Sequence, residues 1–225
     1  MYYMYNTWAL FAGFLFCIII RCSYFVVDYY LLGKNTFYDS LEPHRKLYVQ
    51  KNLVKSACLA LMLPPALIVL VYPIWYYDNW NTELIQYFAV LYGSNDLTGL
   101  ISVDNLPSTT KIHHFVSSFL VLTALSMDFQ SSEIAQSLLV YTFFAASAYI
   151  VNFQLAVRWL FKRGECNWLR YFAGAVYTVS CTLSWSWQLW WAYNVDLDWY
   201  HLLYVVLMLW IVRDDIILMR WLTSI

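Results

Sequence analysis

The chain has 225 residues, of which 62% are hydrophobic and 20% are aromatic, while only 12% are charged. Soluble domains carry about one quarter charged residues, so these values and the long apolar runs exclude an ordinary soluble core and predict a membrane protein with several spans. The formal net charge is −1 and no polybasic tail is present, which argues against nucleic acid as a partner.

The first apolar run, residues 8–27, has the length of a transmembrane helix rather than of a signal peptide. No basic residue precedes it, Arg21 lies within it, and no pair of small residues suited to cleavage follows it. We therefore interpret this run as a retained first span.

Seven stretches are apolar enough to be transmembrane helices, since about 20 residues cross a hydrocarbon core of roughly 30 Å. The predicted spans are residues 8–27, 53–72, 84–103, 110–127, 134–152, 168–192 and 199–212. The last stretch is short, and we expect it to continue past Val212 with Arg213 reaching the interface. Without it the chain would cross six times.

The basic residues favour seven spans, because all 13 then fall on one side of the membrane. They are Arg21, Lys34, Arg45, Lys46, Lys51, Lys55, Lys111, Arg158, Lys162, Arg163, Arg170, Arg213 and Arg220. The opposite connections hold Asp78, Glu83, Asp128, Glu133, Asp196 and Asp198, without Lys or Arg. The positive-inside rule then places the N-terminus outside or in the lumen and the C-terminus in the cytosol.

Two local features modify this predicted arrangement of spans. Pro64, Pro65 and Pro73 are expected to kink or end the second span, because proline lacks a backbone N–H. The longest connection, residues 28–52, is expected to be cytosolic and to contain a surface helix.

Three ionisable residues inside the spans give the main functional clue, because such groups are costly in a bilayer. Asp96 lies in the cytosolic half of the third span, and His113 and His114 lie one turn inside the fourth. These spans form an antiparallel hairpin, so Asp96 is expected near the histidines in depth. Adjacent residues point about 100° apart on a helix, so one histidine can face a cavity while its neighbour supports it.

Other polar residues lie on related helix faces and predict a polar half-cavity of lipid size near the cytosol, with apolar walls above it. They are Tyr92, Ser117, Ser147, Asn152, Tyr177, Ser180, Ser184 and Gln188. Such a cavity suits an amphiphile whose headgroup reacts near the cytosolic face. For the serines of the fifth and sixth spans and for Gln188 alone, hydrogen bonding between helices is the stronger interpretation.

A histidine pair beside an aspartate can be catalytic or purely structural, and the residues alone favour neither interpretation over the other. A neutral imidazole can accept a proton from an amine or hydroxyl, or attack a thioester, and an acidic neighbour would fix its tautomer. The alternative is an Asp–His pair that only joins helices. The four histidines lack the HxxxH and HxxHH spacing of membrane di-iron enzymes, so no metal and no bound cofactor are expected.

An ordered set of motifs resembles the TLC domain family of translocation-associated, longevity-assurance and ceroid-lipofuscinosis membrane proteins. The matching segments are residues 92–97, residues 111–117 with the two histidines, Ser147 followed by Asn152, and Asn52 with Ser56. The resemblance covers roughly residue 51 to the C-terminus. It implies an all-α bundle of about seven transmembrane helices. Residues 1–50 would form the first helix and its cytosolic connection, and residues 51–225 a six-helix TLC-like domain.

The chain also departs from the family pattern. Leu59 stands where many members have histidine, and Ala145 and Tyr149 stand where many have Glu and Pro. The acidic motif of ceramide synthases and their homeobox-like segment are missing. In those enzymes the His-His pair serves acyl transfer from acyl-CoA to a sphingoid amine, so these departures favour a smaller lipid-related relative.

The sequence thus leaves several functions open. The first is acyl transfer to a lipid amine, with acyl-CoA as co-substrate, His113 or His114 as base or acyl acceptor and Asp96 as orienter. The second is a lipid-binding, trafficking or membrane-composition factor without turnover. A seven-helix receptor or a transporter is weaker, because no retinal-binding lysine and no repeat between the halves is present. The expected partner is a membrane lipid or acyl chain, a homodimer is left open, and the resemblance suggests the endoplasmic reticulum.

Overall fold

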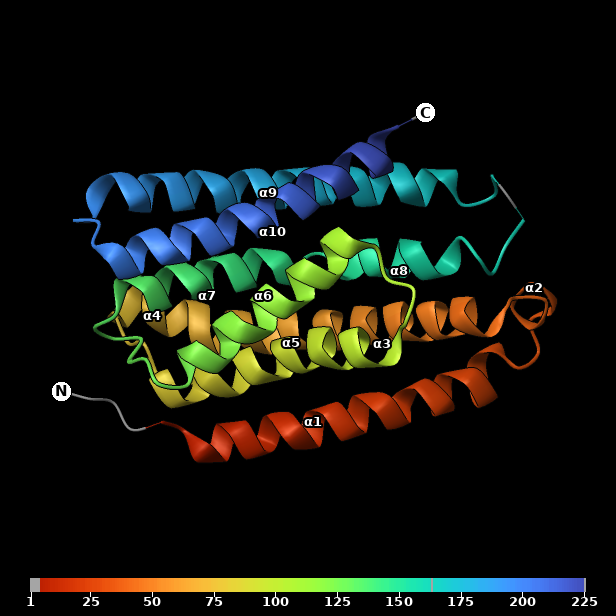
Figure 1. The fold of residues 1–225 in the computed structure, drawn as a ribbon, viewed down its shortest axis with the longest axis horizontal. Coiled ribbons are helices and arrows are strands. Elements are labelled where there is room, and N and C mark those ends of the chain that lie inside the picture. Colours follow the sequence, from red (N-terminus) through yellow and green to blue (C-terminus); the bar gives the residue numbers. More distant parts are fainter. Residues whose placement is uncertain (1–4, 163, 225) are drawn as a thin grey trace.

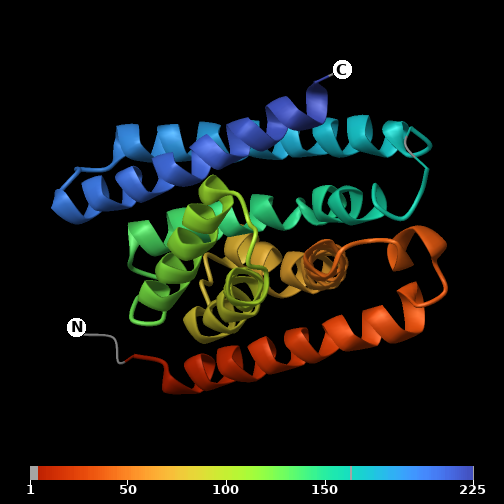
Figure 2. The same cartoon turned by 45° about the vertical axis from the view of Figure 1, so that its right-hand side comes forward.

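The computed structural model describes residues 5–162 and 164–224, and this part of the chain is all-helical, without a strand. Long helices run back and forth along one axis in a bundle (Figures 1 and 2). Their bounds are α1 Thr7–Val26, η1 Val27–Leu32, α2 Thr36–Asp39, α3 Pro43–Ala66, η2 Leu67–Val71, α4 Tyr72–Tyr77, α5 Thr82–Ser102, α6 Ser108–Ala124, α7 Glu133–Ala146, α8 Tyr149–Val157, α9 Asn167–Asn194 and α10 Trp199–Thr223.

Three helical segments are long and apolar enough to cross a membrane: Thr7–Leu32, Pro43–Tyr77 and Glu133–Val157. Large apolar side chains also remain exposed on the outside of the bundle, such as Trp8 at 73% and Leu189 at 72%. Exposed apolar surface of this extent is unfavourable in water. Both features are compatible with a membrane protein.

The connections between helices gather at two ends of the bundle. The connections that follow η1, α5 and α8 lie at one end, together with Lys34 and Lys111, and we name this the basic end (Figure 1). The connections that follow α4, α6 and α9 lie at the other end, which carries Asp78, Asp128 and Asp196.

The second helical segment differs from its predicted bounds. It begins at Pro43, ten residues before the predicted start of the span, so the connection in which a surface helix was expected holds the four-residue α2 and the first turns of α3. Pro64 and Pro65 lie inside α3 without ending it, and the π-helical turn η2 follows them. Prolines remove backbone donors, and a local change to wider helical turns lets the segment continue to Tyr77.

The predicted fifth span is also interrupted. α7 ends at Ala146 and α8 begins at Tyr149, and Ser147 lies at the break. The Ser147 hydroxyl donates to the Phe144 carbonyl at 2.7 Å, and the Ser56 hydroxyl donates to the Tyr149 carbonyl at 2.7 Å. These side chains satisfy backbone groups at the break, so α8 can change direction and pack along α3.

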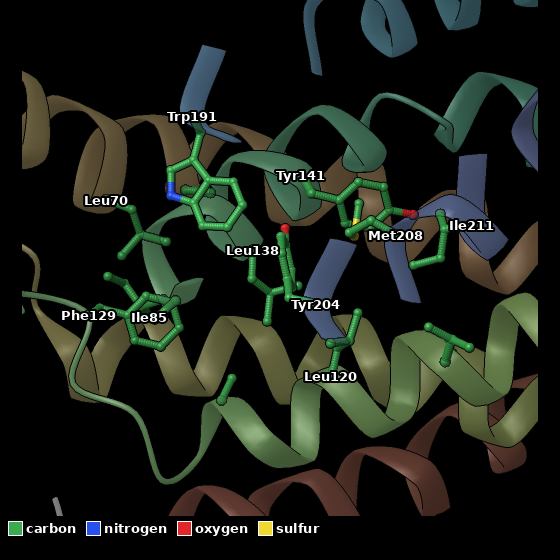
Figure 3. Packing of buried hydrophobic residues seen from close by; sticks show 14 residues of the cluster. Leu70, Ile85, Leu120, Phe129, Leu138, Tyr141, Trp191, Tyr204, Met208 and Ile211 are labelled. Carbon is green, nitrogen blue, oxygen red and sulfur yellow. The ribbon is translucent and has the colours of Figure 1, made fainter. Parts of the chain in front are cut away.

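The apolar core joins η2, α5, α6, α7, α9 and α10 (Figure 3). At its centre the rings of Trp191 and Tyr204 meet edge to face, with centroids 5.3 Å apart. Tyr204 donates to Gln188, which also bonds Ser137 of α7. Gln188 therefore connects helices here rather than lining a cavity.

A small residue sets the distance between α5 and α6. A Cβ atom on Gly93 would lie 3.1 Å from both γ-carbons of Val121. We expect Gly93→Val to lower the free energy of unfolding by about 1–3 kcal/mol, because the added methyl groups overpack this contact. Thermal unfolding in detergent would measure it. Ala175→Val, at an exposed position of α9, is the matched control, and equal melting temperatures for the two variants would contradict the prediction.

A carboxylate joins the connection between α6 and α7 to the first residue of α5, at the end opposite the basic end. Asp128 accepts hydrogen bonds from the hydroxyls of Thr82 and Ser131, both at 2.8 Å, and these bonds lower the pKa of Asp128. As pH falls, the unfolded carboxyl protonates first, so this contribution is present above about pH 4 and is lost as pH drops through the lowered folded pKa. We expect Thr82→Val to weaken this acid dependence in unfolding experiments, whereas the exposed control Thr178→Val should retain it.

Candidate functional site

Asp96 of α5 lies at the centre of a polar cluster and is fully buried. Lys55 of α3 forms an ion pair with its Oδ1 atom, and the Ser117 hydroxyl of α6 donates to its Oδ2 atom at 2.6 Å. Three helices thus meet at one carboxylate. An isolated charge is strongly disfavoured in an apolar interior. The charged Asp96 carboxylate is therefore stable in this buried position only because these partners compensate its charge.

His114 of α6 lies between this carboxylate and a second lysine. Its Nδ1 atom is 3.0 Å from Asp96 Oδ1, and its Nε2 atom is 2.9 Å from Lys51 Nζ. An ammonium group can only donate, so Nε2 accepts and the ring proton of a neutral imidazole lies on Nδ1, towards Asp96. His114 is therefore held from both sides.

Lys51 reaches His114 because the facing position on α5 has no side chain. A Cβ atom on Gly99 would lie 2.6 Å from Lys51 Cε, which is closer than such atoms approach. The absence of a side chain at Gly99 thus makes room for the buried lysine.

His113 turns towards a different helix. Its Nδ1 atom lies 3.3 Å from Asp214 Oδ2 of α10, and the next residue, Asp215, accepts a hydrogen bond from the Tyr177 hydroxyl at 2.6 Å. The two histidine rings meet edge to face, with centroids 5.7 Å apart. The adjacent histidines therefore contact separate carboxylates, one on α5 and one on α10.

A cavity of about 320 Å³ lies beside both histidines, towards the basic end. Its polar wall includes Lys51, Lys55, Asp214 and Asp215. Its apolar lining includes Tyr141, Phe144, Trp185, Leu218 and Trp221. All of its lining residues, among those that the structure describes, lie between positions 48 and 221, so α1 contributes none of them.

Most of the predicted site residues come together at this cavity. Those that line it are Tyr92, His113, His114, Asn152, Tyr177, Ser180 and Ser184. Asp96 and Ser117 lie behind the lining, in contact with Lys55 and with each other. Ser147 does not line the cavity; its hydroxyl oxygen lies 2.6 Å from the Ser180 hydroxyl and can accept a hydrogen bond from it, so it supports the wall from outside.

Sequence reasoning missed five charged residues of the site: Lys51, Lys55, Arg158, Asp214 and Asp215. Both lysines were used in the sequence analysis only to assign one side of the membrane, and no role in the site was predicted for them. In the structure α3 begins at Pro43 and carries both into the bundle, where only 3% of Lys51 and 8% of Lys55 is exposed.

A signal for these residues was present in the sequence. Lys51 and Lys55 are four positions apart and share one helix face. Asp214 and Asp215 form an acidic pair inside α10, which continues past Val212 to Thr223.

Donor atoms of Asp96, His113 and His114 lie within 4.8 Å of one another, a spacing that could hold a metal ion. Here two ammonium groups already contact this set, Lys55 at Asp96 and Lys51 at His114. Cations so close would repel a divalent metal. The arrangement is that of an ion-pair network.

A scan against protein-family models, a search of curated proteins and a search of solved structures each found no match to this chain. The resemblance to the TLC domain family therefore remains an expectation drawn from the motifs.

The Lys55–Asp96 pair offers a test of this network. We expect Lys55→Met or Asp96→Leu alone to lower the free energy of unfolding by about 3–5 kcal/mol, since each leaves a buried charge without its main partner. The double variant should lose less than the sum of the two, because it leaves neither charge. Chemical unfolding in detergent would measure the coupling. Additive losses would show that the two groups do not interact as the structure indicates.

Proposed function

We propose that the protein crosses the membrane seven times with its basic end in the cytosol. Besides the three apolar segments, α5, α6, α9 and α10 have 21, 17, 28 and 25 residues, and a helix of about 17 residues or more can span the bilayer. α5 and α10 are less apolar because they carry the charged residues of the site, which point inwards. The charge difference between the two ends supports this orientation.

We further propose that the cavity binds a lipid and that His113 acts as the general base in acyl transfer to it. The observation that carries this proposal is the position of His113, which lines the cavity with Asp214 beside its ring. Its Nδ1 atom, like that of His114, has no aligned hydrogen-bond partner among the residues that the structure describes, but the other ring nitrogen of His114 is occupied by Lys51. Asp214 can therefore stabilise the imidazolium that forms when His113 takes a proton.

The reaction would proceed as follows. His113 takes the proton from an amine or hydroxyl of the lipid, and the nitrogen or oxygen attacks the thioester carbonyl of acyl-CoA. The carbon–sulfur bond breaks, and the thiolate of coenzyme A receives the proton from His113. His114 acts as a positioning residue, because Lys51 and Asp96 hold its ring on both sides.

The resemblance to the TLC family supports the same class of function and suggests the endoplasmic reticulum. Two of its motif residues have a definite place in the structure. Asn52 lines the cavity, and Ser56 bonds the start of α8. Because the acidic motif of ceramide synthases is missing, the resemblance does not identify the acyl acceptor.

A second candidate is a lipid-binding or membrane-composition factor that uses the same cavity without turnover. One observation favours it: Lys55 pairs with Asp96, and the His114 ring lies between Asp96 and Lys51, so these groups contact one another within the protein. In this case the network would only hold α3, α5 and α6 together. Both candidates require a bound lipid, and only the first requires a product.

Replacing the histidines distinguishes the candidates. We expect His113→Gln to lower the rate of acyl transfer by about 10²–10⁴-fold, because the general base is lost. Asp214→Asn should also lower the rate, since imidazolium would lose its carboxylate. His44→Gln, at a half-exposed position outside the cavity, is the matched control. The assay supplies acyl-CoA and long-chain amines or lysolipids to protein in nanodiscs. Full turnover by His113→Gln would exclude this role, and retained lipid without any product would favour the second candidate.

A further inference from the structure

The charges that line the cavity are separated by sign onto different helices. Lys51 and Lys55 belong to α3, and Arg158 directly follows α8, which packs on α3. The anions Asp214 and Asp215 come from α10, which packs on α6 and α9. The cavity therefore has one basic wall and one acidic wall.

Two of the cations remain without a carboxylate. Lys55 is neutralised by Asp96 behind the lining. Among the described residues, no ion pair involves Lys51 or Arg158, and the buried Nε atom of Arg158 has no hydrogen-bond partner. Aromatic rings surround the Arg158 guanidinium instead, with the Trp221 ring centroid 4.7 Å from its central carbon.

The acidic wall holds a matching number of charges. Asp214 lies beside His113, and Asp215 accepts a hydrogen bond from Tyr177, but neither forms an ion pair with Lys or Arg among the residues that the structure describes. Two basic side chains therefore lie opposite two acidic side chains in the cavity lining. A ligand of net charge would leave one wall uncompensated in an apolar environment, which is costly, whereas a neutral ligand with separated charges would match both walls.

From this arrangement we infer that the lipid bound in the cavity is a zwitterionic phospholipid. Its phosphate lies against Lys51 and Arg158, because a guanidinium group offers a planar set of donors to phosphate oxygens. Its ammonium group lies against Asp214 and Asp215, where the Trp185 ring can contribute a cation–π contact. The inference rests on the proposed function only in requiring that the cavity binds lipid. In the single-chain form of such a lipid, the free hydroxyl would be the acyl acceptor.

Native mass spectrometry with three single-chain probes tests the inference. The probes are oleoyl lysophosphatidylcholine, oleoyl lysophosphatidylglycerol and oleylamine, which are zwitterionic, anionic and cationic. We expect the full-length protein in detergent to bind the zwitterionic probe about tenfold more tightly than either of the others. Tighter binding of the anionic probe or of the amine would overturn the headgroup assignment and leave lipid binding intact. Absence of every bound probe would overturn both proposals.

Charge removal then tests the two walls separately. Asp214→Asn with Asp215→Asn should move the preference to lysophosphatidylglycerol, and Lys51→Met with Arg158→Gln should move it to oleylamine. Asp104→Asn and Arg213→Gln remove the same kinds of charge outside the cavity and should leave the order of preference unchanged. The measured quantity is the order of the affinities for the three probes within one variant. A general loss of affinity would leave this order unchanged. An unchanged order in both double variants would contradict the assignment.

Discussion

The buried Asp96 carboxylate brings α3, α5 and α6 together. A charge in this position is stable only if other groups reach it, and Lys55, Ser117 and His114 do so from α3 and α6. The same contacts fix the relative positions of three helices and the ring of His114. In a membrane, where apolar packing between helices has no advantage over packing against lipid, such polar contacts help to determine which helices associate.

The site uses its two histidines differently, although they are neighbours in sequence. The turn of the helix directs His114 into the network and His113 to the cavity and Asp214. One ring is thereby immobilised between Lys51 and Asp96, and the other has room for a ligand. This division of roles agrees with a supporting residue beside a reacting one, and it makes α10 part of the site.

Much of the architecture followed from patterns within single helices. The apolar runs predicted the long helices, and the hairpin of α5 and α6 placed Asp96 near the histidines. Most of the predicted lining residues lie at the cavity. The predicted bounds were wrong at two helix ends. The break at Ser147 involves contacts with other helices, which periodicity in one segment does not contain, whereas α3 begins at Pro43 with a local proline signal that a search for apolar runs does not use.

The helical class, the compatibility with a membrane and the residues available for a polar site follow from composition and from the period of the helix. The pairing of charged side chains across helices, in contrast, is fixed only when the helices pack. Lys51 and Lys55 resembled residues that flank a span, yet they are buried beside His114 and Asp96, and the acidic pair of α10 faces the same cavity. Pairing across helices depends on their packing and depth, since a buried charge requires a partner in space rather than in sequence.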